Sequence, residues 1–379
     1  MAHLTVDLPA GQDGVSRNAL PYLHGHEAGA VARVLATGHY THGPETELFE
    51  QQVAAFLGAP DVVAVASGTA ALHIALIAAG IGPGDQVVVP SFTFCASVQA
   101  ILACGATPRF ADINPATLCV TADDLLEAVT PATRAVMPVL YGGRAVDLAG
   151  ITPELAGRGI TAVEDAAHAF GSRCHDRQVG STGALTCFSF DPIKNLSCGE
   201  GGALVPRDPA EAERARRIRD LGITQSRAQR SAAISYTVEA FGLRAHLPAV
   251  NAAIGRAQLA RFPAVAGRRT QLWRAYREAL AGIDGVTLTD VDINRTVPFN
   301  CVVRIDRRRD EAFTRLRNQG IGVAVHYPPN HTQPAFAAWH RPLPSTELAA
   351  AQVLSLPFHP ALGPQDAGRV AGLLREALR

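Results

Sequence analysis

The segment FSFDPIKNLSCGEGG, residues 188–202, holds Lys194, the only lysine in a chain of 379 residues with 34 lysines and arginines together. A GC-rich coding bias explains abundant arginine but does not explain one surviving lysine. An amine can lose its proton and form an imine with a carbonyl group, whereas a guanidinium stays protonated. Lys194 is therefore a candidate Schiff-base residue, with retention by chance as the alternative.

The carbonyl partner of such a lysine is either a carbonyl substrate or pyridoxal 5′-phosphate (PLP). PLP requires a phosphate cradle, which a strand running through small residues into a helix start can provide with free N–H groups. Gly68 and Thr69, in the segment SGTAAL, lie at such a junction. An ordinary helix cap is the alternative interpretation of this segment.

PLP also requires an acid beside its pyridine nitrogen and a flat group over its ring. The segment VEDAAHAFG offers Asp165, which we prefer to its neighbour Glu164, and His168 could bond the ring hydroxyl. Phe92 and Phe94, in PSFTF, are candidates for the stacked ring. Asp165 could instead be a helix cap or a surface acid, and His168 could be a structural histidine. The two phenylalanines could be residues of the core.

The distribution of apolar residues predicts the strands and helices that could position these residues. Short runs that are apolar at nearly every position alternate with helix-like segments, which predicts an α/β fold with a mostly parallel central sheet covered on both faces. Ligands of such sheets bind at strand ends. The predicted strands are 61–66, 85–90, 107–113, 134–141, 159–166 and 184–190.

The pattern changes after about residue 245. One helical segment is predicted over 248–282, followed by a strand candidate, CVVRID, and a helix that ends in glycine. We therefore expect a large domain over residues 1–245 and a smaller α/β C-terminal domain over residues 246–379.

Composition argues against several classes of function. The formal net charge is zero and basic residues are spread along the chain, which argues against nucleic-acid and acidic-membrane partners. The longest apolar stretch is shorter than the roughly 20 residues that span a bilayer, and the first residues do not read as a signal peptide. The seven cysteines contain no CxxC pair and read as reduced thiols of a cytoplasmic protein. Cys174 and His175 are neighbours, but two ligands do not make a zinc site, so no metal is expected.

Several motifs together resemble a known family. They are SGTAAL, PSFTF, EDAAHAFG, CFSFDPIKN with GEGG, AAIGRAQL, GIGVAVHYPP and VLSLPFHP. Their order from about residue 20 to the C-terminus resembles that of the DegT-type sugar aminotransferases, which are PLP enzymes of fold type I. Each motif is weak alone, whereas the combination is specific.

The resemblance implies a role for each matching residue. Lys194 matches the Schiff-base lysine that also acts as general acid and base, and Asp165 matches the partner of the pyridine nitrogen. His168 matches the residue near the ring hydroxyl, and Phe94 matches the stacked aromatic. The phosphate contacts correspond to Gly68, Thr69, Ser189 and Arg244, and candidate substrate contacts are His246, His326 and Tyr327.

The resemblance also implies a reaction and an assembly. Family members transfer an amino group from L-glutamate or L-glutamine to a keto sugar, often nucleotide-linked, through pyridoxamine phosphate, and they work as homodimers with shared active sites. The alternatives are a keto-cyclitol or another polyol ketone as acceptor, a PLP-dependent sugar dehydratase, and a regulatory protein on the same scaffold. Retention of Lys194 favours transamination over dehydration and regulation.

Three residues depart from the family pattern, and two of them, His246 and Leu140, are expected near the substrate side. Arg244 replaces an asparagine that usually reaches the partner subunit's phosphate, and His246 replaces an arginine. Leu140 replaces a frequent histidine. The departures at His246 and Leu140 leave the identity of the acceptor open.

Overall fold

The computed structural model describes residues 14–23, 25–225, 229 and 232–379. Its centre is a seven-stranded sheet with the order β1-β9-β8-β5-β4-β2-β3. Pairs from β3 through β8 are parallel, and β9 is antiparallel to both of its neighbours. The predicted mostly parallel sheet is therefore confirmed. Its strands are β1 (Val63–Val65), β2 (Gln86–Pro90), β3 (Thr107–Ala111), β4 (Thr133–Val136), β5 (Thr161–Asp165), β8 (Leu185–Ser189) and β9 (Gly202–Val205).

Helices cover both faces of this sheet, which explains why its strands are apolar at nearly every position. Successive side chains of a strand point to opposite faces. Val88 accordingly packs in one core cluster, and Val87 and Val89 pack in another. One face is covered by α3 (Gly68–Ala78), α4 (Cys95–Ala103) and α7 (Pro209–Arg219). The other is covered by α2 (Pro44–Leu57), α5 (Ala122–Ala128), α6 (Thr152–Gly157) and α9 (Ala249–Leu259).

All six predicted strands are present, but β9 was not predicted. It is four residues long and starts at Gly202, so its apolar run is too short to stand out. A Cβ atom on Gly202 would lie 2.4 Å from the backbone oxygen of Ser67. Glycine is needed there because β9 passes directly beside the turn that joins β1 to α3.

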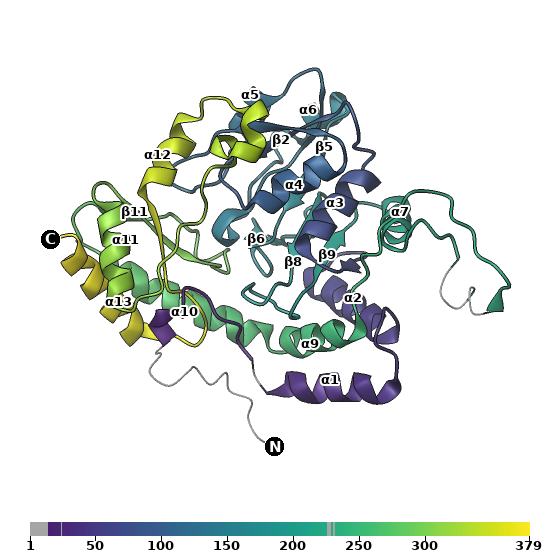
Figure 1. Ribbon diagram of the computed structural model, residues 1–379, viewed down its shortest axis with the longest axis horizontal. Coiled ribbons are helices and arrows are strands. Elements are labelled where there is room, and N and C mark those ends of the chain that lie inside the picture. Colours follow the sequence, from purple (N-terminus) through teal and green to yellow (C-terminus); the bar gives the residue numbers. More distant parts are fainter. Residues whose placement is uncertain (1–13, 24, 226–228, 230–231) are drawn as a thin grey trace.

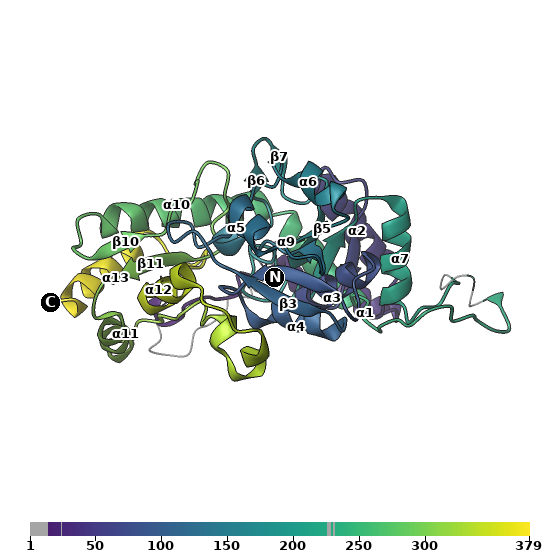
Figure 2. The same cartoon turned by 90° about the horizontal axis from the view of Figure 1, so that it is seen from above.

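A second, three-stranded sheet lies at the other end of the molecule, as Figures 1 and 2 show. It consists of β10 (Val286–Leu288), β11 (Cys301–Ile305) and β12 (Val353–Leu356). It shares a core with α11 (Arg309–Asn318), α13 (Pro364–Ala377) and the second half of α10 (Phe262–Leu280). Val15 also packs in this core, although it lies in the range predicted for the large domain. The division at residues 245 and 246 stays a prediction.

The helix predicted over 248–282 is two helices. α9 ends at Leu259 and α10 begins at Phe262, with Arg261 between them at φ −108° and ψ 0°. Pro263 lies in the first turn of α10. Proline lacks the N–H that a continuous helix needs, but this is no loss in a first turn, so the break falls just before it.

The described part of the segment between α7 and α9 extends away from the body of the molecule (Figures 1 and 2). It carries apolar side chains in the open: Ile234 is fully exposed, and Phe241 and Tyr236 are 79% and 62% exposed. Exposed apolar residues in one projection are typical of a surface that another chain covers. Within the described residues, no helix is long and apolar enough to cross a membrane.

The remaining elements are short or peripheral. α1 (His26–Thr37) packs on α9, and α12 (Pro344–Gln352) leads directly into β12. β6 (Arg173–Cys174) and β7 (Arg177–Gln178) form a small antiparallel hairpin after β5.

Candidate active site

A cavity of about 450 Å³ opens at the carboxyl ends of β5 and β8, beside the turn from β1 into α3. This is the edge at which open α/β sheets bind ligands. The cavity collects all the predicted site residues except Arg244 and His246. Those that line it are Gly68, Thr69, Phe94, Asp165, His168, Ser189, Lys194, His326 and Tyr327.

Lys194 lies in the loop between β8 and β9, where its backbone N–H donates to the oxygen of Asp191 at 3.0 Å. Burial lowers the pKa of its amine, against the opposing effect of the Asp165 and Asp191 carboxylates. Its Nζ lies 4.6 Å from the centre of the Phe299 ring. A lowered pKa favours the neutral amine, which is the form that reacts with a carbonyl group.

Buried polar side chains hold the residues on either side of Lys194. Asn195 Nδ2 donates to the backbone oxygen of Val297 at 3.0 Å. The guanidinium of Arg269 is 2% exposed and donates to the backbone oxygen of Ile193 at 3.4 Å. Burial lowers the pKa of Arg269 to about 10, which still leaves it charged at neutral pH. The loop therefore presents the amine from a fixed position.

Asp165 ends β5 and is held by two donors. Ser97 Oγ, in the first turn of α4, donates to Oδ2 at 2.6 Å, and the backbone N–H of Ala167 donates to Oδ1 at 3.1 Å. Burial raises the pKa of Asp165, while the Ser97 bond is the largest of the effects that lower it. The bond to Ser97 thus keeps a buried carboxylate closer to its ionised form.

The neighbouring acid, Glu164, lies on the opposite face of the sheet from the Lys194 cavity. Its Oε2 accepts a hydrogen bond from Thr186 Oγ1 at 2.7 Å. Burial raises the pKa of Glu164 to about 7. Alternation along β5 therefore separates the two adjacent acids, and only Asp165 lines this cavity.

His168 is neutral and held by a short network. The backbone N–H of Gly142 donates to Nδ1 at 3.3 Å, which assigns the ring proton to Nε2. Nε2 lies 3.2 Å from the hydroxyl of Tyr327, and the ring stacks on Phe299 at 3.9 Å. Burial lowers the pKa of His168 well below its usual value, and the Lys194 charge lowers it further. The Nε2–H of His168 is therefore directed at Tyr327, a residue that lines the cavity.

The start of α3 forms a narrow cradle. Ser67 caps the helix, because its Oγ accepts the N–H of Ala70 at 3.1 Å. Gly68 and Thr69 are the first helical residues, so their N–H groups have no partner within the helix. A Cβ on Gly68 would lie 2.7 Å from the Cβ of Ser189, so only glycine permits this approach of α3 to β8.

The two candidate aromatic residues have different surroundings. Phe92 is fully buried and packs against Tyr141, with ring centres 5.4 Å apart. Phe94 is 55% exposed at the cavity, 5.7 Å from the ring of Tyr327. Phe94 is therefore free to cover a flat ligand, whereas Phe92 belongs to the core.

His326 and Leu140 also differ in their relation to the cavity. His326 lines it, with Nδ1 2.9 Å from Ser355 Oγ, and burial lowers its pKa to about 4. Leu140 is buried, and its backbone N–H donates to the oxygen of Asp165 at 2.9 Å. The departure at Leu140 is therefore a core residue behind Asp165.

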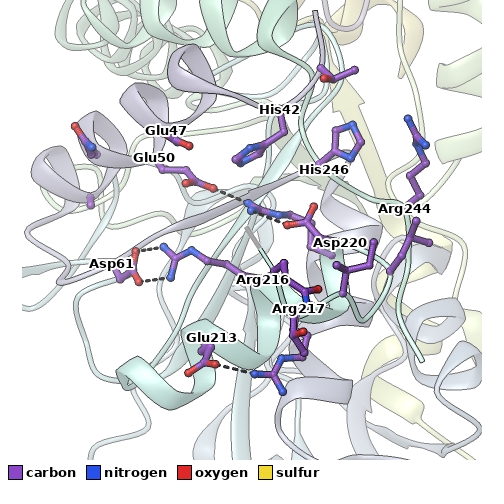
Figure 3. Close-up of a pocket in the computed structure, with 18 of the residues that line it drawn as sticks. His42, Glu47, Glu50, Asp61, Glu213, Arg216, Arg217, Asp220, Arg244 and His246 are labelled. Atoms are coloured by element: carbon purple, nitrogen blue, oxygen red, sulfur yellow. Dashed lines mark hydrogen bonds and ion pairs between the residues drawn. The ribbon is translucent and has the colours of Figure 1, made fainter. Parts of the chain in front are cut away.

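Arg244 and His246 lie in a second cavity of about 1060 Å³, drawn in Figure 3. Their segment is anchored beside β1, because Ala66 N–H donates to the oxygen of Ala245 at 2.7 Å. The structure thus places the segment of both residues beside the strand that leads into the phosphate-cradle turn, but both residues lie outside the Lys194 cavity of the same chain.

The arginines of this second cavity differ in their pairing. Arg216 makes two bonds to Asp61, at 2.6 and 2.8 Å (Figure 3), and Arg219 pairs with the buried Glu50 at 2.7 Å. Within the described part of the chain, the guanidinium of Arg244 has no ion-pair partner. Arg244 is therefore the arginine of this cavity that remains available for an external anion.

Sequence reasoning missed three residues of the Lys194 site. Ser97 was one polar residue in an apolar helix, and nothing nearby marked it as the partner of Asp165. Phe299 and Arg269 come from the C-terminal third, far along the chain from Lys194. No local motif indicates such contacts, because they arise only when distant segments pack together.

The fold and the cavity together define a class of enzyme, and comparison with known proteins agrees with it. The chain belongs to the DegT/DnrJ/EryC1/StrS aminotransferase family, whose profile matches residues 21–375. The protein is an aminotransferase, as the motifs implied.

Individual relatives include a transaminase of a nucleotide-linked sugar and two aminotransferases of known structure. The chain is 41% identical over 355 residues to the dTDP-3-amino-3,4,6-trideoxy-alpha-D-glucose transaminase of Streptomyces venezuelae, covering 92% of this chain and 90% of that protein. The structure of S. venezuelae DesV in complex with a ketimine intermediate aligns with a TM-score of 0.87 and 39% identity, over 93% of this chain and 95% of that one. The aminotransferase TlmJ from Streptoalloteichus hindustanus aligns with a TM-score of 0.90 and 37% identity, over 96% and 98% of the two chains.

Proposed function

We propose that this protein is a PLP-dependent aminotransferase that transfers an amino group from L-glutamate or L-glutamine to a keto sugar. A nucleotide-linked keto-deoxy sugar is the favoured acceptor. The observation that carries the proposal is the meeting of Lys194, Asp165 and the Gly68 cradle in one cavity. The transaminase of S. venezuelae, at 41% identity, supports a dTDP-linked sugar as the acceptor class.

The cavity fits PLP in shape and in donor chemistry. Because residue 68 has no Cβ, the start of α3 approaches Ser189 closely, and its free N–H groups can bind an oxyanion beside that hydroxyl. Thr69 and Ser189 add hydroxyl donors to this cradle. When bound, PLP would act as an electron sink for the carbon that carries the transferred nitrogen.

The residues of the chain then take separate roles. Lys194 would hold the cofactor and, once released, would move a proton, which requires an amine that is neutral part of the time. Asp165, held as a carboxylate by Ser97, would partner the pyridine nitrogen. His168 would donate from Nε2 to the ring hydroxyl, and Phe94 would cover the ring.

We further propose a homodimer in which each subunit completes the active site of the other. Arg244 and His246 lie outside the Lys194 cavity of their own chain, so they would reach the partner's cavity. The extended segment with Ile234, Tyr236 and Phe241 would be buried against the partner. An unpaired arginine suits a phosphate group, because a guanidinium can donate two parallel hydrogen bonds to it.

His326 and Tyr327 are the proposed substrate contacts, because both line the cavity near Phe94. We place the enzyme in the cytoplasm, in keeping with seven free cysteines and no disulfide among them.

An isotope-transfer assay tests the reaction. The PLP-loaded protein is incubated with ¹⁵N-labelled L-glutamate or L-glutamine and a panel of dTDP-linked keto sugars, free keto sugars and keto-cyclitols. The expected product is a ¹⁵N-amino sugar that keeps its nucleotide. If only a cyclitol acquires the label, the acceptor is a cyclitol and the proposed sugar acceptor is wrong. A dehydrated product without nitrogen would show that the reaction is an elimination and not an aminotransfer.

A further inference from the structure

Three potential metal ligands meet on the surface away from the Lys194 cavity. One ligand atom each from Asp147, Cys174 and His175 lies within 4.8 Å of the others. His175 Nε2 is 2.7 Å from Asp147 Oδ2. A carboxylate, a thiolate and an imidazole are the three ligand types that zinc takes in proteins. The sequence pair Cys174 and His175 alone predicts no metal site, and the fold supplies the third ligand.

The backbone holds these ligands in place. Cys174 ends β6 and pairs with Arg177 of β7 across the hairpin. His175 occupies the turn at φ 51°, the left-handed region, which turns its ring toward Asp147. Asp147 Oδ1 accepts the backbone N–H of Ala149 at 2.9 Å, which leaves Oδ2 directed at His175. Outer partners of this kind orient metal ligands.

The three ligands border a cavity of about 330 Å³ that also contains a buried carboxyl group. Glu164 is 4% exposed and lines this cavity. Thr186 donates to its Oε2, and within the described residues no donor bonds its other oxygen. The second oxygen of Glu164 can therefore accept a hydrogen bond from a water in this cavity.

Two arginines also line the cavity and would oppose a cation. Arg207 is neutralised by Glu211, which it meets at 2.7 Å. Arg177 donates to the backbone oxygen of Thr182 at 3.2 Å. Arg207 therefore adds no net charge beside the cluster, and Arg177 is held to a backbone oxygen rather than to the ligands.

We propose that Asp147, Cys174 and His175 bind one zinc ion, with a fourth coordination position open toward the cavity that contains Glu164. Binding would displace the thiol proton of Cys174 and the proton shared by His175 and Asp147. Three protein ligands and an open position are the arrangement of zinc sites that hold a water or a substrate, whereas closed structural sites use four protein ligands.

Metal binding is measured on the PLP-loaded, untagged full chain after removal of metal by a chelator. Zinc is titrated in competition with a chromophoric chelator, and cobalt is added separately so that its visible bands report tetrahedral coordination by sulfur. The expected result is one ion per chain. Cys174→Ser and His175→Asn should each weaken binding by at least about tenfold, since loss of an outer partner alone costs about 10–100-fold.

The variants are chosen so that a loss of metal binding cannot be explained by misfolding. Asparagine tolerates the left-handed backbone of residue 175, so His175→Asn keeps the turn. Cys104→Ser is the matched control, because Cys104 is also a half-buried thiol, directed at the backbone oxygen of His73. Absence of a stoichiometric ion, or equal affinity in the wild type and both ligand variants, overturns the proposal.

Discussion

The hydrogen bond from Ser97 to Asp165 makes a quantitative prediction. Removal of the hydroxyl in Ser97→Ala leaves a buried carboxylate with one remaining donor, the N–H of Ala167. A hydrogen bond to a charged group contributes about 1.5–3 kcal/mol, and one pKa unit corresponds to about 1.4 kcal/mol. The acidic midpoint of the kcat/KM profile should therefore move upward by about 1 to 2 pH units.

The sign follows from the effect of burial. Burial raises the pKa of Asp165 and the Ser97 bond lowers it, so loss of the bond lets the pKa rise further. The carboxylate must be ionised to partner the pyridine nitrogen, so activity should be lost first at low pH. At pH values above the displaced midpoint, the rate should recover toward that of the wild type.

The adjacent acid provides a matched control. Thr186 donates to Glu164 at 2.7 Å, which is nearly the same bond on the opposite face of the sheet. Thr186→Ala should leave the pH–rate profile unchanged, and Ser97→Thr should restore the profile of the wild type. A Ser97→Ala profile that coincides with that of the wild type would refute the assigned role of Asp165.

Three further substitutions test other parts of the site. Lys194→Arg should keep the fold by circular dichroism and lose aminotransfer by at least about a hundredfold, because a guanidinium cannot act as a neutral amine; an active variant would contradict this. Gly68→Ala should weaken PLP binding by about 10-fold to 100-fold in a fluorescence titration, because its Cβ collides with Ser189. Gly82→Ala is the control, because a Cβ at residue 82 would meet nothing within 4 Å, and this variant should bind PLP normally. Equal PLP affinities of Gly68→Ala and Gly82→Ala would refute the proposed phosphate site at Gly68. Arg244→Ala should weaken PLP retention by about tenfold if Arg244 crosses the dimer interface; unchanged retention would make it a surface arginine.

The fold could be predicted largely because its strands are buried on both faces. An apolar run such as VVAV can be recognised without knowledge of its neighbouring strands, and the Ser-Gly-Thr turn at Gly68 marks the helix start. β9 and the break before Pro263 were missed. The first is short and opens with Gly202, and the second interrupts an apolar pattern that continues through it.

Local patterns indicated site residues only where these follow strand ends, whereas His326 and Tyr327 were implied only by the family resemblance. Asp165 and Lys194 are recognisable by type and place, and strand alternation separates Asp165 from Glu164. Ser97 and Arg269 act through contacts between segments far apart in sequence. The role proposed for Arg244 would depend on a second chain, which no pattern within one sequence describes.

One absorbance titration tests the central claim that Lys194 and its cavity carry out aminotransfer with PLP. The protein is purified with PLP, and L-glutamate and L-glutamine are then added separately while the cofactor spectrum is recorded. The expected result is a PLP band that is lost on addition of one donor, with growth of the pyridoxamine phosphate band, and no such change in Lys194→Arg. A protein that retains no PLP band, or a band that neither donor changes, would contradict the proposed reaction.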